Sequence, residues 1–253
     1  MDTVATRALP RIGRVRENLR IAGFIDVETT GLHPGFDEVV EFAIVLFAFD
    51  AKTGQIAGVV DEYVGLRDPG RPIPPQATRV HGIRDTDVHG KRLDERRIGA
   101  LVERAEFLVA HNASFDRAFV EKLVPQTKEK HWYCSMNGVP WKRLGFVSKG
   151  LQRLLADHGI RVNRAHRGLD DVKGALALLA RADASGSCYF KYIADWHRAT
   201  VSGGAMRSGT AAERAHVLSD ATLAAASDCS SDAGIPSDAT SADRFAGVDE
   251  AKA

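Results

Sequence analysis

Two acidic residues, Asp26 and Glu28, stand at the end of an early apolar run of the sequence. The run from Ile21 to Glu28 predicts a buried strand that leads into a turn. Side chains two residues apart in a strand point to the same face, so both carboxylates should emerge together and could chelate a cation. An acidic pair at a strand end more often faces solvent, so a metal site needs further ligands.

Two further acidic residues stand near the beginning of predicted helices. Asp116 lies in the first turn of a helix after a predicted strand, and Asp171 lies in the first turn of a later helix, after a loop that contains His166. A negative charge in the first turn suits the helix dipole, so each residue alone is explained as a helix-start charge. They matter for the acidic pair because a metal site there needs further acidic ligands of this kind.

Three segments, in this order, resemble the motifs of the DnaQ-like 3′-to-5′ exonucleases of the DEDDh type. They are Phe24 to Gly31, His111 to Asp116, and His166 to Asp171. A further segment around His81 matches one that lies near the terminal nucleotide in relatives. The resemblance covers residues 23–179, and its spacing of five residues after the histidine selects Asp171 as a ligand over the adjacent Asp170.

The resemblance implies metal-dependent hydrolysis of the terminal phosphodiester of DNA, with release of nucleoside 5′-monophosphates. Two divalent cations, Mg²⁺ or Mn²⁺, suit hard oxygen ligands. The implied ligands, which also belong to the catalytic set, are Asp26, Glu28, Asp116 and Asp171. His166 is the implied general base, because an imidazole ordinarily titrates near a pH of about 6.5. The implied substrate contacts are Thr30, Gly31, Leu32, His81, Asn112 and Phe115.

The sequence leaves the biological setting of this activity open. Many proofreading subunits have an Asp-Thr pair where this chain has Trp-Tyr-Cys-Ser at residues 132–135. The alternatives are therefore an enzyme that acts alone, a proofreading subunit bound to a DNA polymerase, and an oligoribonuclease-like RNA exonuclease. Discrimination of DNA from RNA depends on the pocket around the 2′ position, which sequence does not reveal. The expected substrate is a single-stranded or frayed 3′ end, with a DNA polymerase or another repair protein as an open choice of partner.

Apolar periodicity predicts the elements that must position these residues. Stretches rich in Val, Ile, Phe and Tyr at residues 38–49 and 55–66 flank a polar turn and predict an antiparallel hairpin. The proline-rich residues 68–75 predict an irregular crossing loop. Helices and one more strand are predicted from residue spacing. The helices are 93–104, 113–123, 149–158 and 169–182, and the strand is 107–110.

This order of elements, strands first and then helices alternating with strands, predicts the fold class α/β. The expected architecture is a mixed β-sheet with antiparallel first strands, flanked by α-helices, and the family resemblance implies that it is RNase H-like. Three segments are predicted: a basic N-terminal extension at 1–20, an exonuclease domain at 21–200, and a low-complexity, disordered tail at 201–253. The tail has one aromatic residue, Phe245, and too little apolar surface to offset the entropy of ordering.

Composition limits the possible classes of protein. The 34 Lys and Arg residues nearly cancel the 33 Asp and Glu residues, so an argument for nucleic-acid binding must rest on a site. The 3 cysteines are widely spaced and form no CxxC pair, which disfavours a disulfide framework and a zinc site. No apolar run approaches the roughly 20 residues that span a bilayer, and no secretory signal is recognised. A cytoplasmic protein without a membrane partner is expected.

Overall fold

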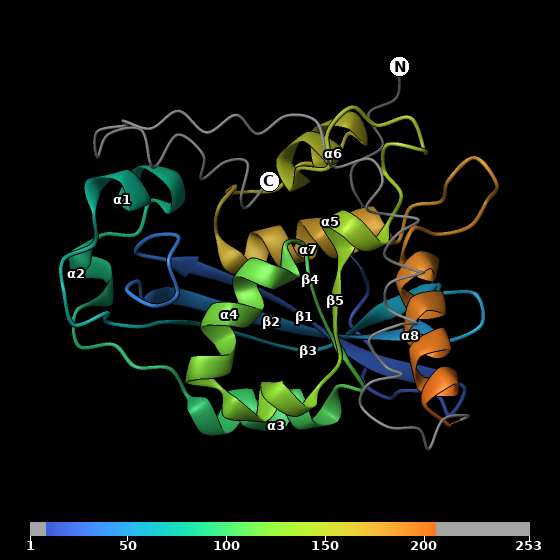
Figure 1. The fold of residues 1–253 in the computed structure, drawn as a ribbon, viewed down its shortest axis with the longest axis horizontal. Helices are drawn as coiled ribbons and strands as arrows, with labels where there is room; N and C mark the ends of the chain where they lie inside the picture. Colours follow the sequence, from blue (N-terminus) through green and yellow to red (C-terminus); the bar gives the residue numbers. More distant parts are fainter. Residues whose placement is uncertain (1–8, 206–253) are drawn as a thin grey trace, which may run out of the picture. The chain divides into compact units, whose positions relative to one another are not determined.

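A computed structural model of the chain describes residues 9–205, and its centre is a five-stranded β-sheet (Figure 1). The strand order is β3-β2-β1-β4-β5. Three long strands are antiparallel: β1 (Leu19–Thr29), β2 (Val39–Asp50) and β3 (Ile56–Leu66). Two short strands, β4 (Leu108–Ala110) and β5 (Trp132–Cys134), continue the sheet in parallel with β1. This mixed sheet confirms the predicted fold class.

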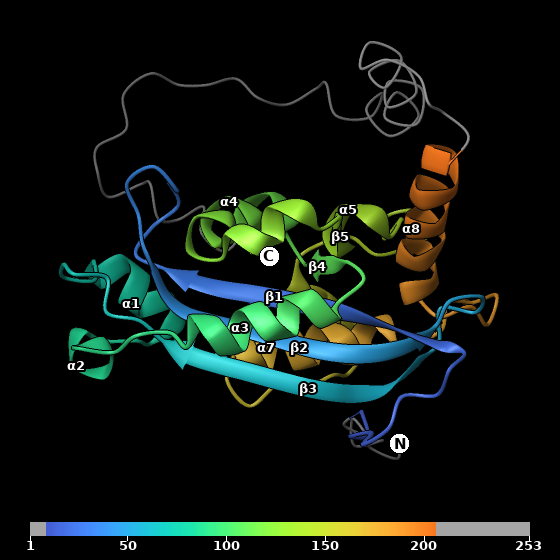
Figure 2. The same ribbon diagram turned by 90° about the horizontal axis from the view of Figure 1, so that it is seen from below.

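Helices cover both faces of the sheet (Figure 2). One face packs against α3 (Glu95–Arg104) and α4 (Ala113–Leu123), and the other packs against α7 (Gly168–Leu179) with α6 (Leu151–Asp157). Short segments connect these elements, and α8 ends the described chain. They are α1 (Pro75–His81), α2 (Asp85–Val88), the 3-10 helix η1 (Pro125–Glu129), α5 (Ser135–Gly138) and α8 (Phe190–Ala205).

The alternation of side chains along β1 decides which face carries the acidic pair. Phe24 packs in the core on the α7 side, whereas Ile25 and Val27 pack in the core on the side of α3 and α4. Because successive strand residues point to opposite faces, Asp26 and Glu28 share the α7 face with Phe24. The sheet is buried on both sides here, so these two carboxylates interrupt an otherwise apolar layer.

The predicted hairpin is confirmed, and its turn is built by Asp50. The Asp50 carboxylate accepts hydrogen bonds from the backbone N–H groups of Thr53 and Lys52, each at 2.9 Å. These hydrogen bonds, that from Thr53 more than that from Lys52, lower the pKa of Asp50 because they stabilise its charged form. Gly54 has a φ of 71°, and a Cβ there would collide with the backbone of Lys191 at the start of α8. Glycine therefore lets the hairpin turn and α8 approach closely.

Several elements were not predicted from the sequence. Helix α1 begins at Pro75, inside the segment expected to be irregular, because proline is tolerated in the first turn of a helix. Strand β5 and helix α8 were also missed.

The helix predicted at 113–123 has those bounds, and α3 begins after Asp94, whose side chain accepts a hydrogen bond from the Arg97 N–H at 2.9 Å. Among the described residues, no helix is both long enough and apolar enough to cross a membrane.

The first half of α8 belongs to the core of the compact unit that ends at His197. Phe190 is fully buried and makes edge-to-face contacts with Phe47 and Phe49 at centroid distances of 5.1 and 5.0 Å. His197 is buried as well, and its ring bonds to the Tyr133 hydroxyl at 3.0 Å. A second unit begins at Arg198, and the structure describes it as far as Ala205.

The predicted terminal segments lie partly outside the described residues, which exclude 1–8 and 206–253. The described part of the N-terminal segment runs along β3. The N–H of Ile12 donates to the carbonyl of Val59 at 2.9 Å, and the N–H of Val59 donates to the carbonyl of Pro10 at 2.8 Å. The predicted boundaries at residues 20 and 200 stay predictions.

We predict that Phe190→Ala destabilises the protein by about 3 to 5 kcal/mol, because the change leaves a cavity in the aromatic core. Phe36→Ala is the matched control, since the same atoms are removed from a side chain that is 81% exposed. Its effect should stay within about 0.5 kcal/mol. Urea unfolding followed by circular dichroism measures both variants. Equal effects would mean that α8 does not pack as described.

Candidate metal centre

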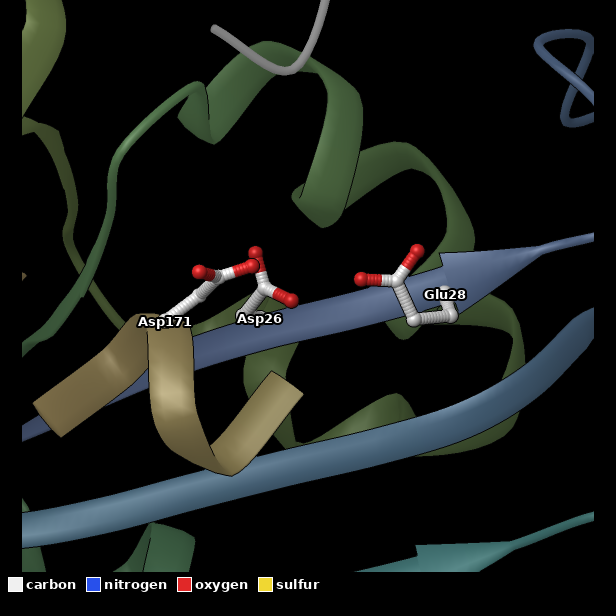
Figure 3. Close-up of side chains that lie close together, drawn as sticks. All are labelled: Asp26, Glu28 and Asp171. Atoms are coloured by element: carbon white, nitrogen blue, oxygen red, sulfur yellow. The ribbon is translucent and has the colours of Figure 1, made fainter. Parts of the chain in front are cut away.

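Three carboxylates from two elements meet on the α7 face of the sheet. Asp26 and Glu28 come from β1, and Asp171 comes from the first turn of α7 (Figure 3). One carboxylate oxygen of each lies within 4.8 Å of the others. Glu28 and Asp171 are buried, and Asp26 is half-buried. The structure therefore brings together three of the four predicted ligands, although Asp171 lies far from Asp26 and Glu28 in the sequence.

Close packing of α7 on the sheet brings Asp171 to this position. A Cβ on Gly168 would lie 3.0 Å from the Cβ of Ala43 on β2, so a larger side chain would push the helix outward. The Nε2 of Gln152 on α6 donates to Oδ1 of Asp171 at 2.8 Å and orients the carboxylate. The neighbouring Asp170 instead approaches Arg164 at 3.4 Å. Consecutive residues of a helix point in different directions. Asp171 therefore faces the carboxylate group, whereas Asp170 forms an ion pair with Arg164.

Asp116 reaches the same strand from the other side of the sheet. β4 pairs with β1 at Gly23 and Phe24. Farther along this edge, the N–H of Val27 donates to Oδ1 of Asp116 at 3.2 Å, and Asp116 is buried. Val27 separates the two acidic residues of β1. Asp116 is therefore held beside the three-carboxylate group, although it is not one of the residues within the 4.8 Å spacing.

The donor set fits a divalent cation. Three negative charges at this spacing repel one another, and burial of a carboxylate without a compensating charge is strongly unfavourable. Carboxylate oxygens are hard ligands, which Mg²⁺ and Mn²⁺ prefer over the nitrogen and sulfur ligands of zinc sites. These three residues could therefore hold a metal, and Asp116 could add a fourth carboxylate. The electrostatics of the cluster thus favour a bound divalent ion.

A further buried acidic residue, Glu41 on β2, was missed by the sequence analysis. Its side chain is 2% exposed and pairs with the Arg167 guanidinium, whose Nη2 donates to Oε1 at 2.6 Å. This hydrogen bond with Glu41 raises the pKa of Arg167 above its ordinary value. A charged residue inside the apolar run of β2 was the available signal, since charged side chains are rarely fully buried unless paired.

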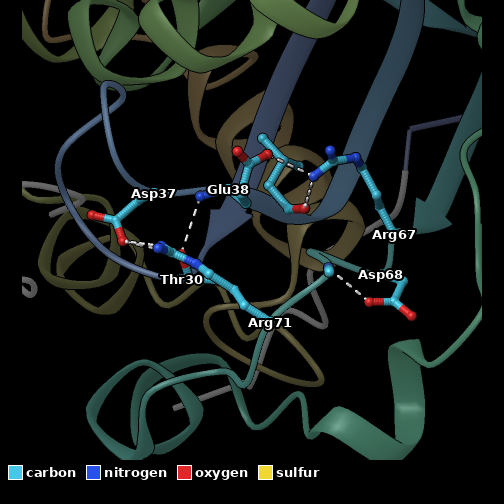
Figure 4. Close-up of polar contacts among 8 residues, drawn as sticks. Thr30, Asp37, Glu38, Arg67, Asp68 and Arg71 are labelled. Carbon is cyan, nitrogen blue, oxygen red and sulfur yellow. Dashed lines mark hydrogen bonds and ion pairs between the residues drawn. The ribbon is translucent and has the colours of Figure 1, made fainter.

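The turn after β1 is tied to the proline-rich segment by a polar network (Figure 4). The Thr30 hydroxyl donates to Oδ1 of Asp37 at 3.0 Å and accepts from the N–H of Glu38 at 3.0 Å. Nη2 of Arg71 donates to the Thr30 hydroxyl and to Asp37, each at 2.8 Å. A Cβ on Gly31 would lie 2.5 Å from the Asp37 carboxylate, so a larger residue there would displace Asp37 from this network. The turn is therefore tightly constrained.

The remaining predicted site residues lie in three other places. His81 ends α1 and is buried, and its Nδ1 accepts from the N–H of Ile83 at 3.0 Å. Asn112 is the residue before α4, and its side-chain oxygen accepts from Ser114 at 3.1 Å. Phe115 is half-buried against the α4 core. Each of these residues thus has a structural contact within its own segment.

His166 and Leu32 are both half-buried in loops that adjoin the carboxylate-bearing elements. Leu32 follows β1, and His166 lies two residues before α7 begins. His166 has a φ of 58°, and among the described residues it is the one non-glycine residue with a positive φ. Such a left-handed conformation is uncommon outside glycine and often marks a functional position.

Comparison with known proteins identifies the family. Residues 24–179, more than half of the chain, match the RNase_T family model, described as exonuclease. The matched range begins within β1 and ends with α7, so it includes all three carboxylates of the cluster. The chain belongs to this exonuclease family and is a DnaQ-like exonuclease with the RNase H-like fold. Members of the family typically use divalent metals, in agreement with the carboxylate cluster.

Individual relatives include bacterial DNA polymerase III proteins. The chain is 29% identical over 176 residues to DNA polymerase III subunit epsilon of Treponema pallidum, across 65% of this chain and 76% of that protein. It is 31% identical over 154 residues to a PolC-type DNA polymerase III of Thermotoga petrophila, across 59% of this chain and 11% of that protein. The chain therefore spans about a tenth of the length of such PolC-type relatives.

A solved structure of Escherichia coli exonuclease I in complex with a dT13 oligonucleotide has a similar fold. The TM-score is 0.51 with 19% sequence identity, and the match covers 62% of this chain and 40% of that chain. At this identity the comparison supports the fold.

We predict that Mn²⁺ stabilises the wild-type protein against heat, by about 2.7 kcal/mol at roughly 100 times the Kd. Asp171→Asn should lose most of this stabilisation, and its metal-free form should melt higher than wild type because one of three repelling charges is gone. Asp170→Asn, the adjacent control, should respond to Mn²⁺ like wild type. Scanning calorimetry with and without Mn²⁺ measures all three proteins. An unchanged Mn²⁺ response in Asp171→Asn would contradict the assigned cluster.

Proposed function

We propose that this chain is a 3′-to-5′ exonuclease that hydrolyses the terminal phosphodiester of DNA and releases nucleoside 5′-monophosphates. The observation that carries the proposal is the approach of Asp26, Glu28 and Asp171 to within 4.8 Å in a member of the exonuclease family. DNA is the favoured substrate because these relatives are a PolC-type DNA polymerase III and the epsilon subunit of a DNA polymerase III. The DEDDh arrangement suggested by the sequence is part of the same proposal.

The proposed ligands divide between two sides of β1. Asp26, Glu28 and Asp171 approach from the α7 face, and Asp116 approaches along the edge that it shares with Val27. This arrangement offers enough carboxylate oxygens for two divalent cations, Mg²⁺ or Mn²⁺. The chemistry supplied by such a pair when bound is activation of a water and stabilisation of the departing 3′ oxygen. Four carboxylates would also balance the charge of two such ions.

His166 is the proposed general base. Its imidazole nitrogen would accept the proton of the attacking water, and the left-handed backbone at His166 would direct the ring. No covalent enzyme intermediate is needed in this scheme. Asp171 follows His166 by five residues, so the base and a metal ligand would be carried by one short segment.

Recognition of the strand end is proposed for the turn after β1 and its surroundings. The Thr30 hydroxyl is engaged with Asp37, Glu38 and Arg71, so backbone groups of the turn would meet the terminal nucleotide. Leu32 would pack against the terminal base. Such contacts hold a 3′ end without reading its sequence. The proposed set of substrate contacts is Thr30, Gly31, Leu32, His81, Asn112 and Phe115.

A second candidate function is proofreading within a polymerase complex. Its support is the similarity to the epsilon subunit of Treponema pallidum, of which 76% is aligned. In that case a DNA polymerase would be the protein partner, and the same metal centre would remove misincorporated nucleotides. Activity of the purified chain on free oligonucleotides distinguishes an enzyme that works alone from one that needs a polymerase.

We predict that the purified protein shortens 5′-labelled single-stranded DNA one nucleotide at a time, and that a chelator stops the reaction until Mg²⁺ or Mn²⁺ is restored. Asp26→Ala should lower the rate on the order of a thousandfold while the protein stays folded. Gel electrophoresis of the products from DNA and RNA oligonucleotides of the same sequence measures the direction of digestion and the preference for DNA or RNA. Immediate release of the labelled 5′ nucleotide would reverse the proposed direction, and full activity in excess chelator would exclude a metal-dependent reaction.

We predict that His166→Ala loses most turnover, about a hundredfold or more, because a positioned general base contributes roughly that factor. Metal binding should persist, since the four carboxylates are retained. His89→Ala is the control, because the side chain of His89 is 91% exposed. Single-turnover rates and titration with Mn²⁺ measure the two effects separately. Turnover near the wild-type value in His166→Ala would require a different base.

A further inference from the structure

Two buried glutamates face each other across the hairpin strands. Glu28 on β1 and Glu41 on β2 are Cα partners, and each is 1% exposed. Directly opposed residues of neighbouring strands point to the same face, and two like charges in this arrangement destabilise the sheet. Glu28 belongs to the carboxylate cluster. Glu41 must therefore be compensated by something other than the proposed metal site.

Glu41 is fully engaged by two consecutive residues of the segment before α7. Oε1 accepts from Nε and Nη2 of Arg167 at 3.1 and 2.6 Å. Oε2 accepts from Nε of Arg167 at 3.2 Å and from the N–H of Gly168 at 2.8 Å. A buried carboxylate bound in this way by a planar guanidinium is among the stronger and more directional polar contacts in proteins.

These contacts lie immediately beside His166 in the chain. Arg167 follows His166 directly, and its carbonyl accepts from the N–H of Asp171 at 3.0 Å in the first turn of α7. The strained φ of His166 persists in a fold only where the surroundings hold it. The hydrogen bonds from Arg167 and Gly168 to Glu41 attach the segment directly after His166 to strand β2. They therefore limit where His166 can lie.

We propose that the Glu41–Arg167 pair is a positioning device for His166, which fixes the imidazole relative to the carboxylates of β1. Arg167 and Glu41 are positioning residues in this scheme and need not touch the substrate. The inference rests on the proposed function, in which His166 is the general base. A bidentate guanidinium fixes both distance and angle, whereas a lysine ammonium in its place would keep the charge and lose the angular constraint.

The first test uses two changes in the full-length chain. Arg167→Lys keeps the charge, and Glu41→Gln combined with Arg167→Gln removes the pair without leaving a buried charge unpaired. We expect kcat on a 5′-labelled DNA oligonucleotide to fall about tenfold and about a hundredfold respectively, because a small misplacement of a reacting group can lower the rate by that order. KM and the affinity for Mn²⁺ should change less than about twofold. Arg164→Lys is the matched control, on the same loop but paired with Asp170, and should keep the wild-type kcat.

The second test asks whether the pair acts through His166. If it does, the Glu41→Gln, Arg167→Gln change should lower kcat less than about twofold further in a His166→Ala background, since coupled residues are not additive. If the combined variant instead loses kcat by the product of the two separate factors, the proposal is overturned. An unchanged kcat or a loss of Mn²⁺ affinity in the pair variants would overturn it as well. This cycle separates a positioning role from general destabilisation.

The third test does not depend on activity. Hydrogen exchange at residues 164–168 should become at least about tenfold faster in the Glu41→Gln, Arg167→Gln variant, because the Gly168 N–H and its neighbours lose their anchor. Exchange in β1 and β2 should stay the same. If His166→Ala proves active while this loop loosens as expected, the general base is wrong but the anchor is real. Unchanged exchange in the loop would refute the anchor whatever the activities show.

Discussion

Repulsion among buried carboxylates is the constraint on which the arrangement of this protein depends. Asp26, Glu28 and Glu41 share the α7 face of the sheet, and α7 adds Asp171 to them. Such a concentration of negative charge inside an apolar layer is stable only with cations close by. Arg167 supplies one from within the chain. The charge of the remaining cluster suits divalent ions, which is the basis of the proposed chemistry.

The sheet makes this concentration possible because its central strands are covered on both sides. β2 and the second half of β1 are mostly buried, so their backbone positions are fixed by the helices that pack on them. Gly168 lets α7 begin close to β2, and the short β4 exposes the N–H of Val27 to Asp116. The carboxylates are thereby positioned by core packing rather than by loops, which favours a rigid site.

The loops around the cluster are also anchored. Arg71 connects the proline-rich segment to the turn after β1, and Arg167 connects the His166 loop to β2. In both places an arginine from one segment joins a carboxylate of another. The loops on both sides of the cluster are thus attached to the strands that carry the carboxylates.

The sequence by itself determined the fold class, and its motifs led to the proposal of four carboxylates and His166 as site residues. The fold class follows from local signals, namely the alternation along the strands and the order of the elements, whereas the proposed site residues follow from the resemblance of three short motifs to those of a family. Tertiary structure alone decided which residues meet. Glu41 looked like one charge in an apolar strand, and its partner Arg167 lies 126 residues later, so no local pattern joined them. Helix α8 was missed because its first turn is held by Phe47 and Phe49, which are distant in sequence. Contacts across a fold depend on packing geometry, which short-range periodicity does not encode.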